Sequence, residues 1–95
     1  MFISGGENVY PVEVENVLAA HPAVVDVAVL GEPDARWGEV GRAFVQLGRG
    51  VRPDGAELAA FCRARLAPYK VPVSFAFVAD FPRTSAGKIQ KHLLA

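Results

Sequence analysis

The sequence predicts an α+β domain: a small mixed sheet of about three main strands with helices packed on it, plus an N-terminal two-stranded hairpin. Three observations support this fold class. Valine-rich or alternating segments have the length of strands, segments with helical spacing of apolar residues lie between them, and glycine or proline marks the junctions. With 95 residues and 52% hydrophobic content, the chain is expected to form one domain, residues 1–95, with a single modest core.

The N-terminal part is predicted to be a hairpin followed by a helix. Residues 1–6 read as an extended segment that ends in a Gly-Gly turn. Pro11 suits the first turn of a helix, because its fixed φ is helical and its missing N–H is not needed there. The helix is expected to end at His21-Pro22. Its apolar face is expected to consist of Val14, Val17 and Leu18.

Two central strands are predicted next, with a loop between them. Residues 24–30 are dense in β-branched valine and too short for a buried helix, so they predict a buried strand. The Gly-Glu-Pro-Asp run at 31–34 is expected to break this strand, and residues 35–41 to form a loop in which Trp37 covers the core. Alternation of side chains predicts a second strand over 42–47.

A second helix is predicted after Asp54. This residue, followed three positions later by Glu57, is a capping pair, and Pro68 is expected to stop the helix. Cys62 is the one cysteine of the chain, which excludes an intramolecular disulfide, and we expect it to be a buried small hydrophobe. The apolar stripe of this helix is expected to consist of Leu58, Phe61, Cys62 and Leu66.

The C-terminal third is predicted to contain a strand and a short helix. Residues 73–81 alternate as a third strand, with Phe75 and Phe77 expected in the core. Thr84 is expected to cap a terminal helix. Lys88 would then lie at the mouth of that helix, just after a glycine.

Charge is distributed unevenly along the chain. Residues 1–40 carry a net charge of −6 and residues 41–95 a net charge of +6. Either the two halves pack together and neutralise each other, or the basic half faces a phosphorylated ligand. The overall charge balance and the lack of interleaved aromatics disfavour a nucleic-acid partner. The basic residues clustered near the C-terminus are Arg83, Lys88, Lys91 and His92.

Several protein classes are disfavoured by composition. No apolar run approaches the roughly 18 residues that a bilayer span requires, and the N-terminus lacks the pattern of a secretory signal. We therefore expect a cytoplasmic protein with no membrane span. The sequence has no Cys/His cluster with zinc-ligand spacing, so no metal site is expected.

Lys88 is the best candidate for chemistry. Its ammonium is a compact charge on a flexible stem that can reach anionic oxygens, and the small residues before it leave room for a ligand. The alternative, on these residues alone, is a solvated lysine at the start of a helix.

Three ordered motifs together resemble one family. The run ISGGENVYPVEVE at 3–15, the run YKVP at 69–72 and the run PRTSAGK at 82–88 look like the C-terminal domain of the adenylate-forming enzymes, especially the acyl-CoA synthetases. The resemblance covers essentially the whole chain. It implies a two-step ligation, in which a carboxylic acid and ATP give an acyl-adenylate and pyrophosphate, and CoA then displaces AMP.

The resemblance also implies roles for individual residues. Lys88 would enter the active site during adenylation, and Ser4, Gly5 and Gly6 would line the tunnel for the pantetheine arm of CoA. Lys91 is a weaker candidate for holding phosphate, with a plain solvated position as the alternative.

Other matched positions are expected to be structural. Glu13 and Glu15 are expected to stabilise their helix and contact a larger domain, and Tyr69 to be a packing and turn residue. ATP, with Mg²⁺ in the full enzyme, and CoA are the expected cofactors, none of them bound tightly by this chain alone.

The partner that the resemblance implies is a large N-terminal adenylating domain, which this sequence lacks. The isolated chain is therefore expected to be inactive, and its acyl substrate is not specified. Two alternatives stay open: a free-standing interaction or CoA-binding module, and a basic nucleic-acid binder resting on Lys88, Lys91 and His92. The chain would be either an excised domain or a separately translated protein.

Overall fold

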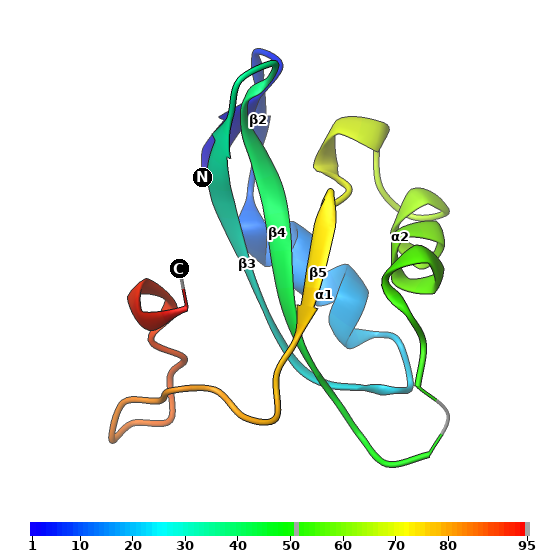
Figure 1. The fold of residues 1–95 in the computed structure, drawn as a ribbon, viewed down its shortest axis with the longest axis vertical. Helices are drawn as coiled ribbons and strands as arrows, with labels where there is room; N and C mark the ends of the chain where they lie inside the picture. The colour runs from blue at the N-terminus through cyan, green and yellow to red at the C-terminus, as the bar shows by residue number, and fades with distance from the viewer. Residues whose placement is uncertain (51, 95) are drawn as a thin grey trace.

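The computed structural model describes residues 1–50 and 52–94 and confirms the α+β class: a mixed five-stranded sheet carries two α-helices on one face (Figure 1). The predicted N-terminal hairpin is present as β1 and β2. The elements in chain order are β1 Phe2–Ser4, β2 Glu7–Val9, α1 Pro11–Ala19, β3 Val24–Asp34, β4 Gly38–Leu47, α2 Gly55–Arg63, the 3₁₀ turn η1 Pro68–Lys70, β5 Ser74–Phe77 and the 3₁₀ turn η2 Lys91–Leu93.

Strand β4 is the centre of the sheet. On one side it pairs along its whole length with β3, antiparallel, from Asp34↔Gly38 to Val24↔Leu47. On its other side it pairs with β1 at the Ser4 end and with β5, in parallel, over its middle. One long strand therefore holds the N-terminal hairpin and the C-terminal third in a single sheet.

The β3–β4 hairpin is longer than predicted: the expected break at 31–34 is wrong, and of the expected loop at 35–41 only a turn at 35–37 is present. Pro33 is tolerated because β3 is an edge strand, where a missing N–H breaks no ladder bond. Gly31 lies opposite Gly41, and a Cβ on Gly31 would come within 2.7 Å of Phe2. This glycine makes room for Phe2 rather than ending the strand. Asp34 closes the turn.

Both helices begin as predicted. Pro11 occupies the first turn of α1, and Oδ1 of Asp54 accepts the N–H of Glu57 at 2.8 Å at the start of α2. Helix α2 ends at Arg63, before the expected stop at Pro68, which instead begins η1. Both helices pack on the same face of the sheet. That core consists of Phe2, Val9, Val14, Leu18, Val27, Val29, Ala43, Val45, Leu58, Cys62 and Leu66.

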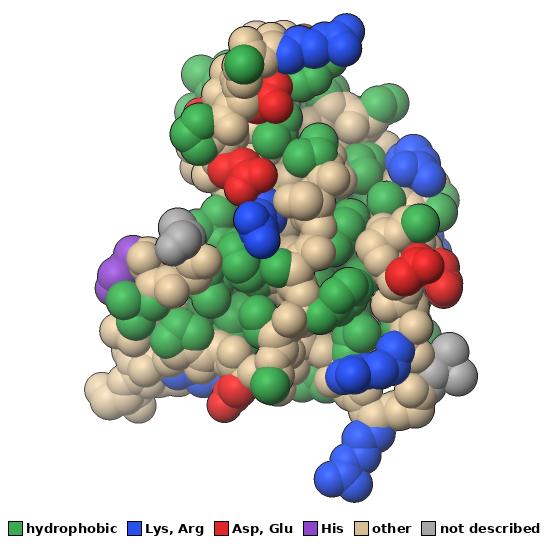
Figure 2. Space-filling model, in the orientation of Figure 1, with side chains coloured by type: hydrophobic (Ala, Val, Ile, Leu, Met, Phe, Trp, Pro, Cys, Tyr) green, Lys and Arg blue, Asp and Glu red, His purple; other side chains and the backbone are tan. Residues whose placement is uncertain are grey.

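A second, smaller apolar cluster lies on the opposite face, where the C-terminal segment crosses the sheet. Phe44, Ala28 and Phe81 are buried there, with Ile89 and Leu94 packed against them. Figure 2 shows hydrophobic side chains gathered in the middle of this face. The C-terminal segment is therefore attached to the sheet by packing at both of its ends.

The C-terminal third differs most from the prediction. Strand β5 spans only Ser74–Phe77, and the side chain of Phe77 is 48% exposed, so the expectation that both aromatics are core is wrong for Phe77. The prediction of a terminal helix is also wrong, because only the 3₁₀ turn η2 forms after the loop at 82–90. No helix in the described part of the chain is long and apolar enough to cross a membrane.

Candidate functional site

Residues 82–90 form a tight loop with the geometry of a small β-hairpin. The N–H of Gln90 donates to the carbonyl of Pro82 at 2.8 Å, and Arg83 and Ile89 form an antiparallel bridge. At the tip, the N–H of Thr84 donates to the carbonyl of Lys88 at 2.8 Å. Lys88 thus lies on a hairpin tip, not at a helix mouth as predicted.

Thr84 and Gly87 shape this tip. The hydroxyl of Thr84 accepts the N–H of Lys88 at 3.2 Å, and its carbonyl accepts the N–H of Gly87 at 2.9 Å. Gly87 has a φ of 86°, a left-handed conformation that favours glycine. Thr84, expected as a helix cap, therefore performs the related task of closing a turn through its side chain.

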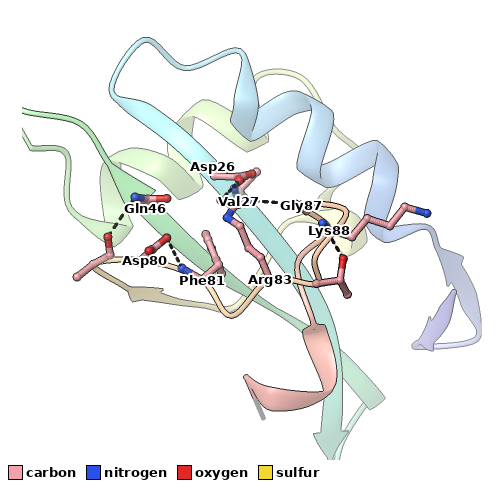
Figure 3. Close-up of polar contacts among 10 residues, drawn as sticks. Asp26, Val27, Gln46, Asp80, Phe81, Arg83, Gly87 and Lys88 are labelled. Carbon is pink, nitrogen blue, oxygen red and sulfur yellow. Dashed lines mark hydrogen bonds and ion pairs between the residues drawn. The ribbon is translucent and has the colours of Figure 1, made fainter.

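The side chain of Lys88 is exposed, and Figure 3 shows it extending away from Asp26 and Arg83. Among residues 1–50 and 52–94, no acidic side chain lies within 4.0 Å of its ammonium. The ammonium is thus available to an anion from outside the domain.

The other bases of the cluster behave differently. Arg83 forms an ion pair with Asp26 at 2.6 Å. Nζ of Lys91 lies 2.7 Å from Glu15 and donates to the carbonyl of Val29 at 3.1 Å. Arg83 and Lys91 therefore fasten the loop to the first half of the chain. The expected phosphate contact of Lys91 stays a prediction.

The charge asymmetry has a structural outcome. Within the described residues, each of the four ion pairs joins an acid from 1–40 to a base from 41–95. The interpretation that the two halves pack together and neutralise each other is confirmed for these bases. These pairs are Glu13–Lys70, Glu15–Lys91, Asp26–Arg83 and Glu32–Arg42.

The Gly5-Gly6 turn lies at the tip of the β1–β2 hairpin. Gly5 and Gly6 have φ values of 56° and 82°, which permit the tight reversal. The N–H of Gly5 donates to the carbonyl of Trp37 at 2.9 Å, which joins this tip to the turn of the β3–β4 hairpin. Ser4, in the strand before the turn, is buried.

A groove of about 380 Å³ runs beside this turn. Aromatic side chains line it: Trp37 is 47% exposed and Tyr69 is 40% exposed. The expectation that Trp37 covers the core is wrong, because its side chain faces solvent at the groove. Tyr69, expected to be a packing and turn residue, does lie in a turn, η1, but its side chain also faces solvent at the groove. The full lining consists of Ser4, Gly5, Glu7, Trp37, Val40, Gly41, Pro68, Tyr69, Val71 and Val73.

The groove was missed because its residues are distant in sequence. Trp37 and Tyr69 come to line the same groove because the two hairpins lie against η1, and no local sequence pattern predicts this arrangement. One local signal was available: aspartate favours turns because its side chain accepts backbone N–H groups that follow it, and Asp34 accepts the N–H of Trp37 at 2.8 Å in the turn that carries this ring.

The two candidate features lie at opposite ends of the molecule. In Figure 1 the Gly5-Gly6 turn is at the top of the longest axis and the loop that carries Lys88, in orange, is at the bottom left. That axis measures 36 Å. The domain therefore presents a free cation at one end and an aromatic groove at the other. Among the described residues, no cluster of three or more metal-ligating side chains occurs.

Comparison with known proteins places this fold among the C-terminal domains of ligases. The sequence model of the family described as "AMP-binding enzyme C-terminal domain" matches residues 13–88. The chain belongs to this family. It is similar to the C-terminal part of a feruloyl-CoA synthase from Amycolatopsis, at 57% identity over 96% of the chain, and of a 2-succinylbenzoate–CoA ligase from Geobacillus kaustophilus, at 53% identity over 99%.

Solved structures agree with the sequence relatives. The fold matches part of a fatty acyl CoA synthetase from Mycobacterium tuberculosis with a TM-score of 0.91 and 44% identity, covering 99% of this chain and 18% of that one. It matches ATP-bound MatB from Rhodopseudomonas palustris with a TM-score of 0.93 and 40% identity, covering 99% and 19%. The chain spans 18% of the feruloyl-CoA synthase and 19% of the 2-succinylbenzoate–CoA ligase.

Proposed function

We propose that this chain is the mobile C-terminal domain of an acyl-CoA synthetase and that it serves the two half-reactions with its two ends. Lys88 would act during formation of the acyl-adenylate, and the Ser4-Gly5-Gly6 edge during thioester formation. The observation that carries the proposal is the exposed ammonium of Lys88, unpaired within the described residues, while the neighbouring Arg83 and Lys91 are held in ion pairs.

In the first half-reaction a carboxylate oxygen of the acid attacks the α-phosphorus of ATP, and the bond to pyrophosphate breaks. Two anions approach each other, so a fixed cation at the forming bond offsets their repulsion. Lys88 has the reach and the freedom for this task, because its side chain extends from a closed turn rather than from a packed surface.

In the second half-reaction the sulfur of CoA attacks the acyl carbon, and AMP leaves with the electrons of the bond it shared with the acyl group. The thiol must first reach that carbon through a narrow passage. The groove beside Gly5 offers an aromatic wall from Trp37 and Tyr69, and the absence of a Cβ at the turn allows close approach of a slender pantetheine arm.

The separation of these features supports mobility. A lysine and a groove at opposite ends of a 36 Å axis do not reach one reaction centre in the same orientation of the domain. The domain would therefore turn between the half-reactions. A large N-terminal domain would hold the acid and the nucleotide, and Mg²⁺, when bound, would neutralise charge on the phosphates.

The experiment uses a hybrid enzyme in which this chain replaces the matching C-terminal segment of the Amycolatopsis feruloyl-CoA synthase. Lys88→Ala is expected to slow acid-dependent exchange of pyrophosphate into ATP by roughly a hundredfold to a thousandfold, leaving a measurable residual rate, and to retain thioester formation from supplied acyl-adenylate. Arg49→Ala, which removes an exposed cation just after β4, is the control and should leave both steps intact. Equal loss of both steps in Lys88→Ala would contradict the proposed role.

The alternative, a free-standing CoA-binding module, is favoured by one observation: the groove of about 380 Å³ lies wholly within this chain. Titration of the 95-residue chain with CoA separates the two proposals. A domain that supplies one wall of a site should bind CoA weakly, whereas a module should bind it tightly without a partner.

A further inference from the structure

Arg83 makes two contacts with one guanidinium group. Its Nη2 lies 2.6 Å from Oδ2 of Asp26 in β3, and its Nη1 donates to the carbonyl of Gly87 at 3.2 Å. Figure 3 shows Arg83 extending from the loop to Asp26 on the sheet, with Gly87 and Lys88 beside it. One planar group thus joins the sheet to the residue that immediately precedes Lys88. A planar, forked donor such as arginine can make both contacts at once.

Asp26 is itself held in place. Its Oδ1 accepts the N–H of Val27 at 2.9 Å, which leaves Oδ2 for Arg83. It follows a register irregularity between Val24 and Asp26, where the strand departs from regular pairing with β4. The carboxylate that receives Arg83 therefore has a fixed orientation on the edge strand.

The remaining contacts at the tip of the loop are internal to it. Thr84 bonds the N–H of Gly87, the N–H of Lys88 and the carbonyl of Lys88, and these bonds fix the shape of the tip. They do not fix its direction relative to the sheet. Lys91 supplies a second attachment, through Glu15 and the carbonyl of Val29 in β3, but it lies beyond the loop. After Lys88, Ile89 packs on the apolar cluster around Phe44. Before Lys88, the polar contact that reaches the sheet is that of Arg83 with Asp26.

We propose that Arg83 is a positioning residue, which acts with Asp26 to aim the loop that carries Lys88. This inference rests on the proposed function, because it matters for the reaction only if Lys88 acts in adenylation. Arg83 would not touch the reacting atoms. It would hold the backbone at Gly87, and so set the position from which the lysine side chain starts.

Stability alone does not explain this arrangement. Both partners of the ion pair are about one-third exposed, at 35% and 33%, and ion pairs exposed to this degree contribute little to folding. The rate of a reaction is more sensitive to position, since a displacement of about 1 Å at a catalytic group can cost roughly a hundredfold. The pair should therefore affect adenylation more than it affects unfolding.

The test uses the hybrid enzyme with Arg83→Met, which keeps the length of the stem and removes both contacts. Adenylation kcat should fall about tenfold, with thioester formation from supplied acyl-adenylate unchanged. Arg83→Lys keeps the charge facing Asp26 but loses the fork, so its loss should be intermediate. Arg65→Met is the matched control, because Arg65 also donates to a backbone carbonyl, that of Phe61 at 2.9 Å, on the distant helix end.

A second comparison distinguishes positioning from a merely structural role. In a Lys88→Ala background, Arg83→Met should cause no further loss of adenylation, because the group it aims is already gone. Asp26→Asn and Arg83→Met should likewise be less than additive. On the 95-residue chain, ¹⁵N relaxation should show faster motion at the amides of Gly87 and Lys88 in Arg83→Met, with unchanged amides in α1.

The outcomes separate this inference from the function on which it rests. If Lys88→Ala loses adenylation while Arg83→Met keeps it, the positioning role is wrong and the proposed function stands. If Lys88→Ala keeps adenylation, the proposed function is wrong, and the positioning role of Arg83 is then wrong as well. A further tenfold loss on adding Arg83→Met to Lys88→Ala would also overturn the inference.

Discussion

Gly5 lies against the ring of Trp37: a Cβ placed on Gly5 would come within 3.0 Å of Cε3 of the indole, and the backbone of the two residues is joined by a hydrogen bond of 2.9 Å. The adjacent Gly6 has the same left-handed type of backbone but nothing within 4 Å of its Cβ position. A substitution at Gly6 would therefore introduce backbone strain alone, whereas the same substitution at Gly5 would add crowding against Trp37 at the groove.

Gly5→Ala should slow thioester formation in the hybrid enzyme by about tenfold, because the added methyl displaces the Trp37 ring in the groove. Adenylation should be unchanged. Gly6→Ala carries the strain of a positive φ, about 1 kcal/mol, without this contact, and its effect on the thioester step should be smaller. Measured rates of the two partial reactions give the comparison. Equal effects of the two variants would show that Trp37 is not involved.

Gly31 is expected to be essential for packing rather than for a turn. Gly31→Ala brings a Cβ within 2.7 Å of the Phe2 side chain, and overpacking of this kind destabilises by about 1–3 kcal/mol. Gly48→Ala is the control, since its nearest neighbour is at 3.4 Å. Urea unfolding of the 95-residue chain measures both. A loss in Gly31→Ala no larger than that in Gly48→Ala would contradict the packing of Phe2 on the sheet.

These glycines illustrate which parts of the fold were accessible from the sequence. The starts of α1 and α2 depend on local chemistry, a proline in a first turn and an aspartate cap, and both were predicted correctly. The β3–β4 hairpin was predicted too short because Gly31 and Pro33 resemble strand breakers. The strand accommodates Gly31 because the Phe2 side chain packs against it, and accommodates Pro33 because β3 is an edge strand. Both reasons depend on tertiary structure.

The candidate site likewise combines features that local sequence predicts with features that depend on tertiary contacts. The motif around Lys88 was visible in the sequence, but the helix expected there is replaced by a loop. Its conformation is set by contacts with β3 and α1, through Asp26 and Glu15, that no local pattern encodes. The exposure of Trp37 and Tyr69 likewise follows from the meeting of distant segments, so the groove that they line appears only in three dimensions.

The ion pair between Lys70 and Glu13 predicts a dependence of stability on alkaline pH. The hydrogen bond with Glu13, at 2.8 Å, raises the pKa of Lys70 above its ordinary value. A group whose pKa is raised on folding contributes its full stability below the unfolded pKa and loses it as pH rises through the folded pKa. The free energy of unfolding should therefore fall more between about pH 8 and about pH 11 in the wild type than in Glu13→Gln. If the free energy of unfolding, measured by urea titration, falls equally with pH in the wild type and in Glu13→Gln, the ion pair does not contribute to stability as described.

Cys62 should be inert in the folded chain. It is fully buried in α2, and burial raises the pKa of its thiol, against a smaller opposing effect of the charges of Arg65 and Arg63. Because the thiolate is the reactive form, labelling with a disulfide reagent should be limited by transient opening of the domain. Ser85→Cys, in the exposed loop, should react at once in the same chain. Rapid labelling of Cys62 without denaturant would show that the core around α2 is not packed as described.

A positive charge at position 88 should be what permits adenylation, and chemical rescue can remove and restore that charge in one enzyme. Lys88→Cys in the hybrid enzyme removes the ammonium, and alkylation with bromoethylamine restores one at nearly the same reach; the buried Cys62 should be spared. Pyrophosphate exchange should be lost in Lys88→Cys and should return on aminoethylation, but not on alkylation with iodoacetamide, which adds a neutral group. Full exchange in unmodified Lys88→Cys, or equal recovery with the neutral reagent, would show that adenylation does not need a positive charge at position 88.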